Sequence, residues 1–190
     1  MEMRGSQTEK NLMKAFAGES QARNRYTYYS AAARKEGYVQ ISGLFEETAG
    51  NEKEHAKVFF KLLEGGTVEF TASYPAGPIG DTAANLLAAA EGEKEEWGTL
   101  YPDFAEIAKE EGFPKVAASF RKIAEVEAYH EMRYRKLLAN LEAGRVFKRD
   151  ETVKWKCQNC GYVHEDTAAP TTCPACDHPQ AHFELWVEAY

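Results

Sequence analysis

Two tetrapeptides, Glu52-Lys53-Glu54-His55 and Glu127-Ala128-Tyr129-His130, carry the strongest structural signal in this 190-residue chain. Each places a glutamate three residues before a histidine, a spacing that brings both side chains to one face of a helix. Another glutamate precedes each: Glu19 lies 33 residues before Glu52, and Glu93 lies 34 residues before Glu127. The pattern indicates a helical hairpin that occurs twice, with one glutamate on its first helix and one Glu-x-x-His on its second.

These glutamates fall on the apolar stripes of four predicted helices. In steps of three and four, the stripes are Leu12, Phe16, Glu19, Ala22, Tyr26; Phe45, Ala49, Glu52, Ala56, Phe59, Leu63; Leu86, Ala89, Glu93, Glu96, Leu100, Ile107; and Val116, Phe120, Ile123, Glu127, His130, Tyr134, Leu137, Leu141. A buried, unpaired carboxylate is costly or has to bind a proton. Cations between the helices remove that cost, and a Glu from each of two helices with Glu-x-x-His from two others is a ligand set of di-iron bundles. Glu96, one turn beyond Glu93, is a fifth candidate ligand or an exposed helix residue.

The helix boundaries predict a ferritin-like four-helix bundle. The signals are a capping box at 6–9 and a stop at Gly37; a helix over about 39–64; a Pro- and Gly-bearing crossover at 67–80; an N-cap at Asp81 and a stop at Gly112; and Pro114 opening a helix that ends at Gly144. The connections are therefore short, long and short, as in two hairpins joined by one crossover. We expect this domain to span residues 1–146.

The C-terminal residues predict a separate metal-binding domain over 152–190, after a linker at 145–152. All four cysteines lie there, as the pairs Cys157/Cys160 and Cys173/Cys176. Two CxxC knuckles define a tetrahedral thiolate site for iron or zinc, and a module this small needs the metal to fold. Gly161 suits the positive φ expected after a knuckle. Iron would make the module an electron carrier, and zinc would make it structural.

Charge and composition exclude several classes of partner. The net charge of −7 argues against nucleic acid or an anionic membrane, because both bind basic surfaces. No apolar run is long enough to cross a bilayer, and the first residues lack the apolar core of a signal peptide. We therefore expect a cytoplasmic protein that binds neither nucleic acid nor membrane.

Taken together, these motifs resemble the rubrerythrin family over essentially the full length. The resemblance rests on AFAGESQARNRY (15–26), ETAGNEKEHAK (47–57), EGEKEEW (91–97), EVEAYHEMRY (125–134), CQNCGYVHE (157–165) and CPACDHPQAHFEL (173–185). One departure is Asp177, where many rubredoxin-like knuckles have glycine.

The resemblance implies a site for two iron ions and a further site for one. Glu52 and Glu127 would bridge the pair, Glu19 would bind one iron, and Glu93 and His130 the other. The first iron would exchange Glu96 for His55 on reduction. Tyr26 and Tyr101 match tyrosines near the family's di-iron site, although both also suit a plain aromatic core. Cys157, Cys160, Cys173 and Cys176 would hold a single rubredoxin-like iron.

The function implied by the resemblance is reduction of hydrogen peroxide to water in defence against oxidative stress. Electrons would come from NADH through an external rubredoxin or flavoprotein reductase, pass through the four-cysteine iron, and cross between subunits of a head-to-tail homodimer. Two alternatives are a ferritin-type ferroxidase that handles iron, and a binding module braced by zinc. Assembly size separates the first from a peroxidase, and metal content separates the second.

Overall fold

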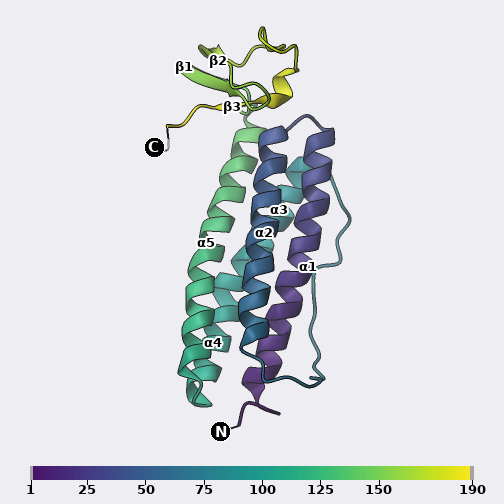
Figure 1. Cartoon of the computed structure of the whole chain (residues 1–190), viewed down its shortest axis with the longest axis vertical. Coiled ribbons are helices and arrows are strands. Elements are labelled where there is room, and N and C mark those ends of the chain that lie inside the picture. Colours follow the sequence, from purple (N-terminus) through teal and green to yellow (C-terminus); the bar gives the residue numbers. More distant parts are fainter. Residues whose placement is uncertain (1, 189–190) are drawn as a thin grey trace.

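The computed structural model describes residues 2–188, which form a long helical bundle with a small sheet domain at one end (Figure 1). The elements are α1 (Gln7–Lys35), α2 (Val39–Lys61), α3 (Thr82–Glu95), η1 (Glu96–Leu100), α4 (Tyr101–Glu110), α5 (Pro114–Glu142), β1 (Lys148–Cys157), β2 (Val163–Ala168), η2 (Gln180–His182) and β3 (Phe183–Leu185). Within this part of the chain, no helix is both long and apolar enough to traverse a bilayer.

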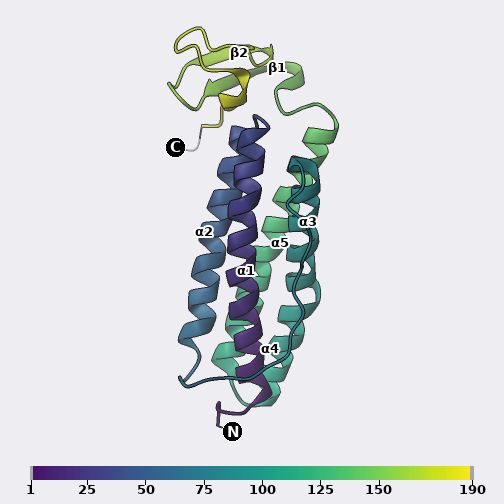
Figure 2. The same cartoon turned by 90° about the vertical axis from the view of Figure 1, so that its right-hand side faces the viewer.

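The predicted four-helix architecture is confirmed. Helices α1 and α2 form one hairpin, while α3, η1 and α4 run on as one rod that pairs with α5. The crossover between the hairpins has no helix or strand; it passes the foot of the bundle and climbs beside α4 and α3 (Figure 2). Short, long and short connections therefore produce the expected ferritin-like order.

Caps fix where the helices begin. Ser6 Oγ accepts a hydrogen bond from the Glu9 amide at 3.0 Å, and Asp81 Oδ1 accepts one from the Ala84 amide at 2.8 Å. The Glu9 carboxylate in turn accepts from the Gly5 amide, one residue earlier than a standard capping box requires. Both predicted N-caps are therefore confirmed.

Two further caps join the hairpins to each other. The Glu111 carboxylate, at the end of α4, accepts hydrogen bonds from the amides of Gln7 and Thr8 at the start of α1. The Glu36 carboxylate, after α1, accepts from the Thr82 amide at the start of α3. A negative charge next to a helix N-terminus interacts favourably with the helix dipole, so each hairpin stabilises the entry of the other.

The third rod contains a π-helical segment that shifts its buried face. Beyond η1 the buried residues are Tyr101, Ala105 and Ala108, whereas Leu100 and Ile107 are only partly buried. The predicted stripe was wrong at these last two positions. A π turn adds one residue to the helix, so every later side chain rotates by one position relative to an unbroken α-helix.

The bundle core consists of two apolar clusters with a polar layer between them. One cluster is centred on Leu12, Phe59 and Phe120, and the other on Tyr29, Phe45 and Tyr134. In α1, α2 and α5 the residues between these clusters include the buried glutamates. The packing on both sides therefore holds the polar layer at mid-length.

The C-terminal domain is a three-stranded antiparallel sheet in the order β2-β1-β3. Its core contains Trp155, Cys157, Ala169, Cys173 and Phe183. Strand β1 begins at Lys148, inside the stretch expected as linker, and the ring of Phe147 stacks on Tyr38 at 6.1 Å between centroids. The domain therefore rests on the end of the bundle at the α1–α2 turn (Figures 1 and 2).

Candidate metal centres

Four glutamates, one from each rod of the bundle, are fully buried at mid-length. They are Glu19 on α1, Glu52 on α2, Glu93 on α3 and Glu127 on α5, each 0% exposed. Two histidines follow one turn after the second and fourth: His130 is buried and His55 is partly buried. The prediction that each helix buries a carboxylate in the core is confirmed.

These side chains form two groups that share two carboxylates. One group is Glu19, Glu52, His55 and Glu127; the other is Glu52, Glu93, Glu127 and His130. In each group, the four candidate ligand atoms lie within 4.8 Å of one another. His55 Nδ1 lies 2.8 Å from Glu127 Oε1, and His130 Nδ1 lies 2.7 Å from Glu127 Oε2. Glu52 and Glu127 thus stand between two neighbouring positions, each with one imidazole and one further carboxylate.

The donor atoms of these groups fit a pair of cations. Among the described residues, buried oxygens of all four glutamates and His130 Nδ1 lack a hydrogen-bond partner. Such atoms are normally satisfied, and leaving one unsatisfied costs about 1–3 kcal/mol. Close contacts without hydrogen-bond geometry are expected of ligands that converge on a common ion. Carboxylate and imidazole suit iron, manganese and zinc.

The pKa values indicate that the groups hold protons when they hold no cation. Burial and the negative charge of Glu52 raise the pKa of Glu93 to about 8. Burial lowers the pKa of His130, but hydrogen bonds to Glu127 and Glu52 outweigh it and raise the value to about 12. Burial also opposes the hydrogen bonds of His55, whose pKa rises to about 9. Metal binding would release these protons, so affinity should increase with pH.

Two buried tyrosines connect the hairpins across the site. Tyr26 Oη donates a hydrogen bond to Glu93 Oε1 at 2.5 Å, and Tyr101 Oη donates one to Glu19 Oε1 at 2.5 Å. Each tyrosine thus orients a glutamate of the other hairpin and leaves the second oxygen of that glutamate for another partner. A hydrogen-bonded outer partner is typical of a metal-ligating carboxylate.

Glu96 is outside both groups. It is the first residue of η1, is partly exposed, and its Oε1 lies 3.8 Å from the position that a Cβ on Gly18 would occupy. Burial and the charge of Glu93 hold the pKa of Glu96 well above its usual range. The structure therefore brings together six of the seven predicted bundle ligands and leaves the Glu96 carboxyl beside them.

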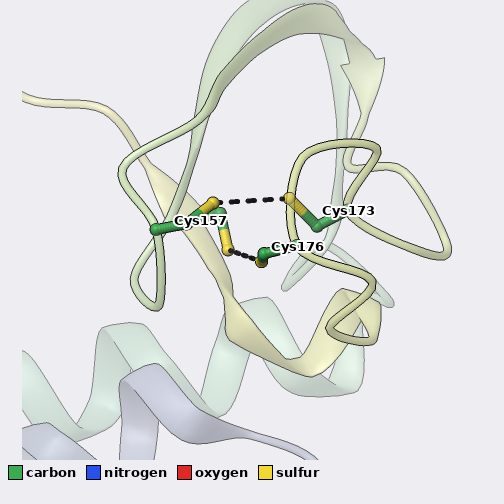
Figure 3. Close-up of side chains that lie close together, drawn as sticks. Cys157, Cys173 and Cys176 are labelled. Carbon is green, nitrogen blue, oxygen red and sulfur yellow. Dashed lines mark hydrogen bonds between the residues drawn. The ribbon is translucent and has the colours of Figure 1, made fainter.

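The four cysteines converge in the C-terminal domain, where the labelled side chains of Figure 3 point toward one another. Cys157 Sγ lies 3.8 Å from Cys176 Sγ, and Cys160 Sγ lies 3.6 Å from Cys173 Sγ. Four thiolates at about 2.3 Å from one ion would be separated by about 3.8 Å at the corners of a tetrahedron. The spacing therefore fits a single iron or zinc ion.

The two cysteine knuckles have matching backbones. The carbonyls of Cys157 and Cys173 accept hydrogen bonds from the amides of Gly161 and Asp177, at 2.8 and 2.9 Å. Gly161 has φ +80° as predicted, and Asp177 adopts φ +57° where glycine is usual. Nearby, a backbone hydrogen bond involving His178 lowers the pKa of Cys176 to about 6, which favours the thiolate that binds metal.

Models of two protein families match the two parts of the chain. The rubrerythrin model matches residues 10–138, and the model of the rubrerythrin rubredoxin-like domain matches residues 155–184. The chain belongs to the rubrerythrin family. Its fold is accordingly a ferritin-like bundle joined to a rubredoxin-like domain.

Relatives extend this similarity over nearly the whole chain. The rubrerythrin of Porphyromonas gingivalis is 63% identical over 182 residues, covering 96% of this chain and 91% of the relative. The rubrerythrin of Nitratidesulfovibrio vulgaris is 57% identical over 183 residues, covering 96% of both chains. The solved structure of fully reduced, all-ferrous nigerythrin superposes with a TM-score of 0.64 at 34% identity, covering 96% of this chain and 87% of that one.

Membership of the rubrerythrin family and the donor geometry agree on the cofactors. The paired carboxylate and imidazole groups form a rubrerythrin di-iron site, and the four cysteines form a rubredoxin-like iron site. The two kinds of donor match their metals, with hard oxygen and nitrogen ligands in the bundle and soft sulfur in the tail.

Sequence reasoning missed the π segment at Glu96 and the pairing of each tyrosine with the other hairpin. The signal for the first was present in the spacing of the repeat, because 33 residues separate Glu19 from Glu52 but 34 separate Glu93 from Glu127. The extra residue had to be placed somewhere in the third rod. No comparable signal identified the tyrosine partners, which depend on how the hairpins pack.

Proposed function

We propose that this protein is a peroxidase that reduces hydrogen peroxide to water. The observation that carries the proposal is a buried two-cation site and a four-thiolate site in one chain. The first suits two-electron reduction of a small oxidant, and the second suits delivery of single electrons. The balanced reaction takes up two electrons and two protons per peroxide, breaks the O–O bond and releases two waters.

We assign the metal ligands from the two groups described above. Glu52 and Glu127 would bridge the ions, Glu19 and His55 would complete one position, and Glu93 and His130 the other. The irons, when bound, supply electrons and polarise the peroxide oxygens. The protein surroundings exclude bulk water, which strengthens every electrostatic interaction in the site.

Glu96 and the two tyrosines are assigned roles next to the ligands. Glu96 keeps a proton at neutral pH because burial opposes its ionisation, so it is placed to deliver that proton to a departing oxygen. The family resemblance further implies that Glu96 exchanges with His55 at one ion. Tyr26 and Tyr101 hold Glu93 and Glu19 in position.

Electron delivery is proposed to occur between two copies of the chain. From Glu127 to the end of α5 at Glu142 the helix rises by about 22 Å, and the cysteine domain lies beyond that end. A head-to-tail homodimer would bring the cysteine site of one copy near the bundle site of the other. An external rubredoxin or an NADH-dependent flavoprotein reductase would reduce the cysteine iron. Thiolate ligands favour a reducing compartment, so we propose the cytoplasm.

The test separates oxidation of the bundle site from turnover. In a Cys173→Ser variant, peroxide should still oxidise the reduced bundle irons once, while steady turnover with NADH and a reductase should fall at least a hundredfold. Thr172→Ser, at the adjacent position, is the matched control and should turn over normally. Unchanged turnover of Cys173→Ser refutes the relay. Oxidation by dioxygen with iron accumulation in a large shell would instead favour the ferritin-type alternative.

A further inference from the structure

A pocket of about 280 Å³ opens beside the carboxylate cluster, where the crossover passes α1 and the π segment. Its inner wall includes Gly18, Glu96 and Tyr101, and its outer wall includes the crossover residues 72–75. None of the four fully buried glutamates lines it. Hydrogen peroxide is about the size of two waters, or roughly 60 Å³. The reduction proposed above therefore leaves most of this volume without a role.

The pocket is amphipathic. Ala15, Leu100 and Phe104 give it an apolar wall, while Arg25 and Glu96 place charged groups in the lining. An apolar cavity of roughly 150 Å³ is enough to bind benzene. A ligand that suits this lining has a small hydrocarbon group and a polar head that is directed at Glu96 and the ligand-bearing Tyr101.

Tyr74 forms the roof of the pocket and is held in place from both sides. Its Oη donates a hydrogen bond to the Lys14 carbonyl at 2.8 Å. Its Cε1 lies 3.7 Å from the position that a Cβ on Gly18 would occupy, and Glu96 Oε1 lies 3.8 Å from the same position. Glycine at position 18 therefore leaves open the space between Tyr74 and the Glu96 carboxyl.

We propose that this pocket binds the hydrocarbon group of an alkyl hydroperoxide, so that the protein reduces organic hydroperoxides as well as hydrogen peroxide. This inference rests on the proposed function, which supplies the electrons. The hydroperoxide ROOH accepts two electrons from the reductase chain and two protons. Its O–O bond breaks, and the products are the alcohol ROH and one water.

The experiment compares two oxidants in three proteins, all full length and iron-loaded. Cumene hydroperoxide and hydrogen peroxide are each supplied with NADH and reductase. Ala72→Phe fills the mouth of the pocket from an exposed crossover position, and Ala76→Phe places the same ring on the crossover outside the pocket lining. The ratio of kcat/KM for cumene hydroperoxide to that for hydrogen peroxide should fall at least tenfold in Ala72→Phe and stay within twofold of wild type in Ala76→Phe.

A binding measurement accompanies the kinetics. The zinc-loaded protein, which is redox-inert, should transfer saturation by NMR to the product alcohol 2-phenyl-2-propanol, and Ala72→Phe should abolish the transfer. Reduction of hydrogen peroxide without any reduction of cumene hydroperoxide overturns the inference and leaves the proposed function standing. Reduction of neither oxidant overturns both. An unchanged ratio or undiminished alcohol binding in Ala72→Phe shows that the pocket is not the site.

Discussion

The hydrogen bond between Tyr101 and Glu19 offers the sharpest test of how the bundle site is held. Tyr101→Phe removes only the hydroxyl, so the ring still fills its place and no cavity forms. Glu19 Oε2 already lacks a partner among the described residues, so the variant leaves the whole buried carboxyl without a hydrogen bond. An unsatisfied buried acceptor costs about 1–3 kcal/mol, and we expect about 2 kcal/mol here. For a chain of this length that corresponds to roughly 4–8 °C in melting temperature.

The assay is thermal and urea unfolding of the metal-free, full-length protein at pH 7, followed by helical circular dichroism. This signal reports the bundle, because the cysteine domain contains no α-helix among its described residues. Tyr134→Phe is the matched control. Its ring is buried in the same core, but its hydroxyl has no hydrogen-bond partner in the described part of the chain. The control should therefore be neutral or slightly stabilising.

The symmetry of the site extends the test. Tyr26→Phe should lose as much as Tyr101→Phe, because Tyr26 makes the equivalent bond to Glu93. The two pairs share no partner, so the double variant should lose about 4 kcal/mol. If Tyr101→Phe unfolds within about 0.5 kcal/mol of wild type, or Tyr134→Phe loses equally, the hydrogen bonds do not organise the site and the reasoning is refuted.

Three further predictions concern pH, backbone strain and capping. The metal-free bundle should lose stability from pH 5 to pH 9, because folded Glu93 (pKa about 8 against 4.5) and His55 (about 9 against 6.5) keep protons that the unfolded chain releases; urea midpoints should fall with pH, and added metal should reverse the trend. Asp177→Gly should relieve about 1 kcal/mol of left-handed strain and slow metal loss to a chelator; faster loss contradicts this. Glu111→Ala should cost about 1 kcal/mol in urea unfolding by uncapping α1, and an unchanged midpoint contradicts this.

The fold and the bundle ligands were predictable because two independent periodicities agreed. Glu52 and Glu127 fell on stripes of apolar residues in steps of three and four, and the hairpin repeat placed them at equivalent positions. A carboxylate on a buried face is costly, so its presence in every helix pointed to cations before any coordinate was known. The same logic located the cysteine site, where the spacing alone defines the donors.

The register of the third rod was not predictable from an unbroken helical period. The stripe through Glu93 was extended to Leu100 and Ile107, but the buried positions are Tyr101, Ala105 and Ala108. A hydrophobic residue lies near either register, so composition did not discriminate between them. Nor does the sequence show that Tyr101 bonds to Glu19, because that contact depends on the packing of one hairpin on the other.

The internal repeat explains why the two halves of the bundle site differ. Glu52 and Glu127 are 75 residues apart, as are Tyr26 and Tyr101, but Glu19 and Glu93 are 74 apart. The additional residue therefore lies between Glu93 and Tyr101, where the π segment η1 occurs. Glu96 belongs to that segment, and the aligned positions on α1, Gln21 and Ala22, carry no acid. One inserted residue thus gives one side of a nearly symmetric site an extra carboxyl, and it lies next to the pocket to which we assign organic hydroperoxides. Interruptions of this kind are common at functional sites, because a local change of helix register re-aims a single side chain without disturbing the packing at either end.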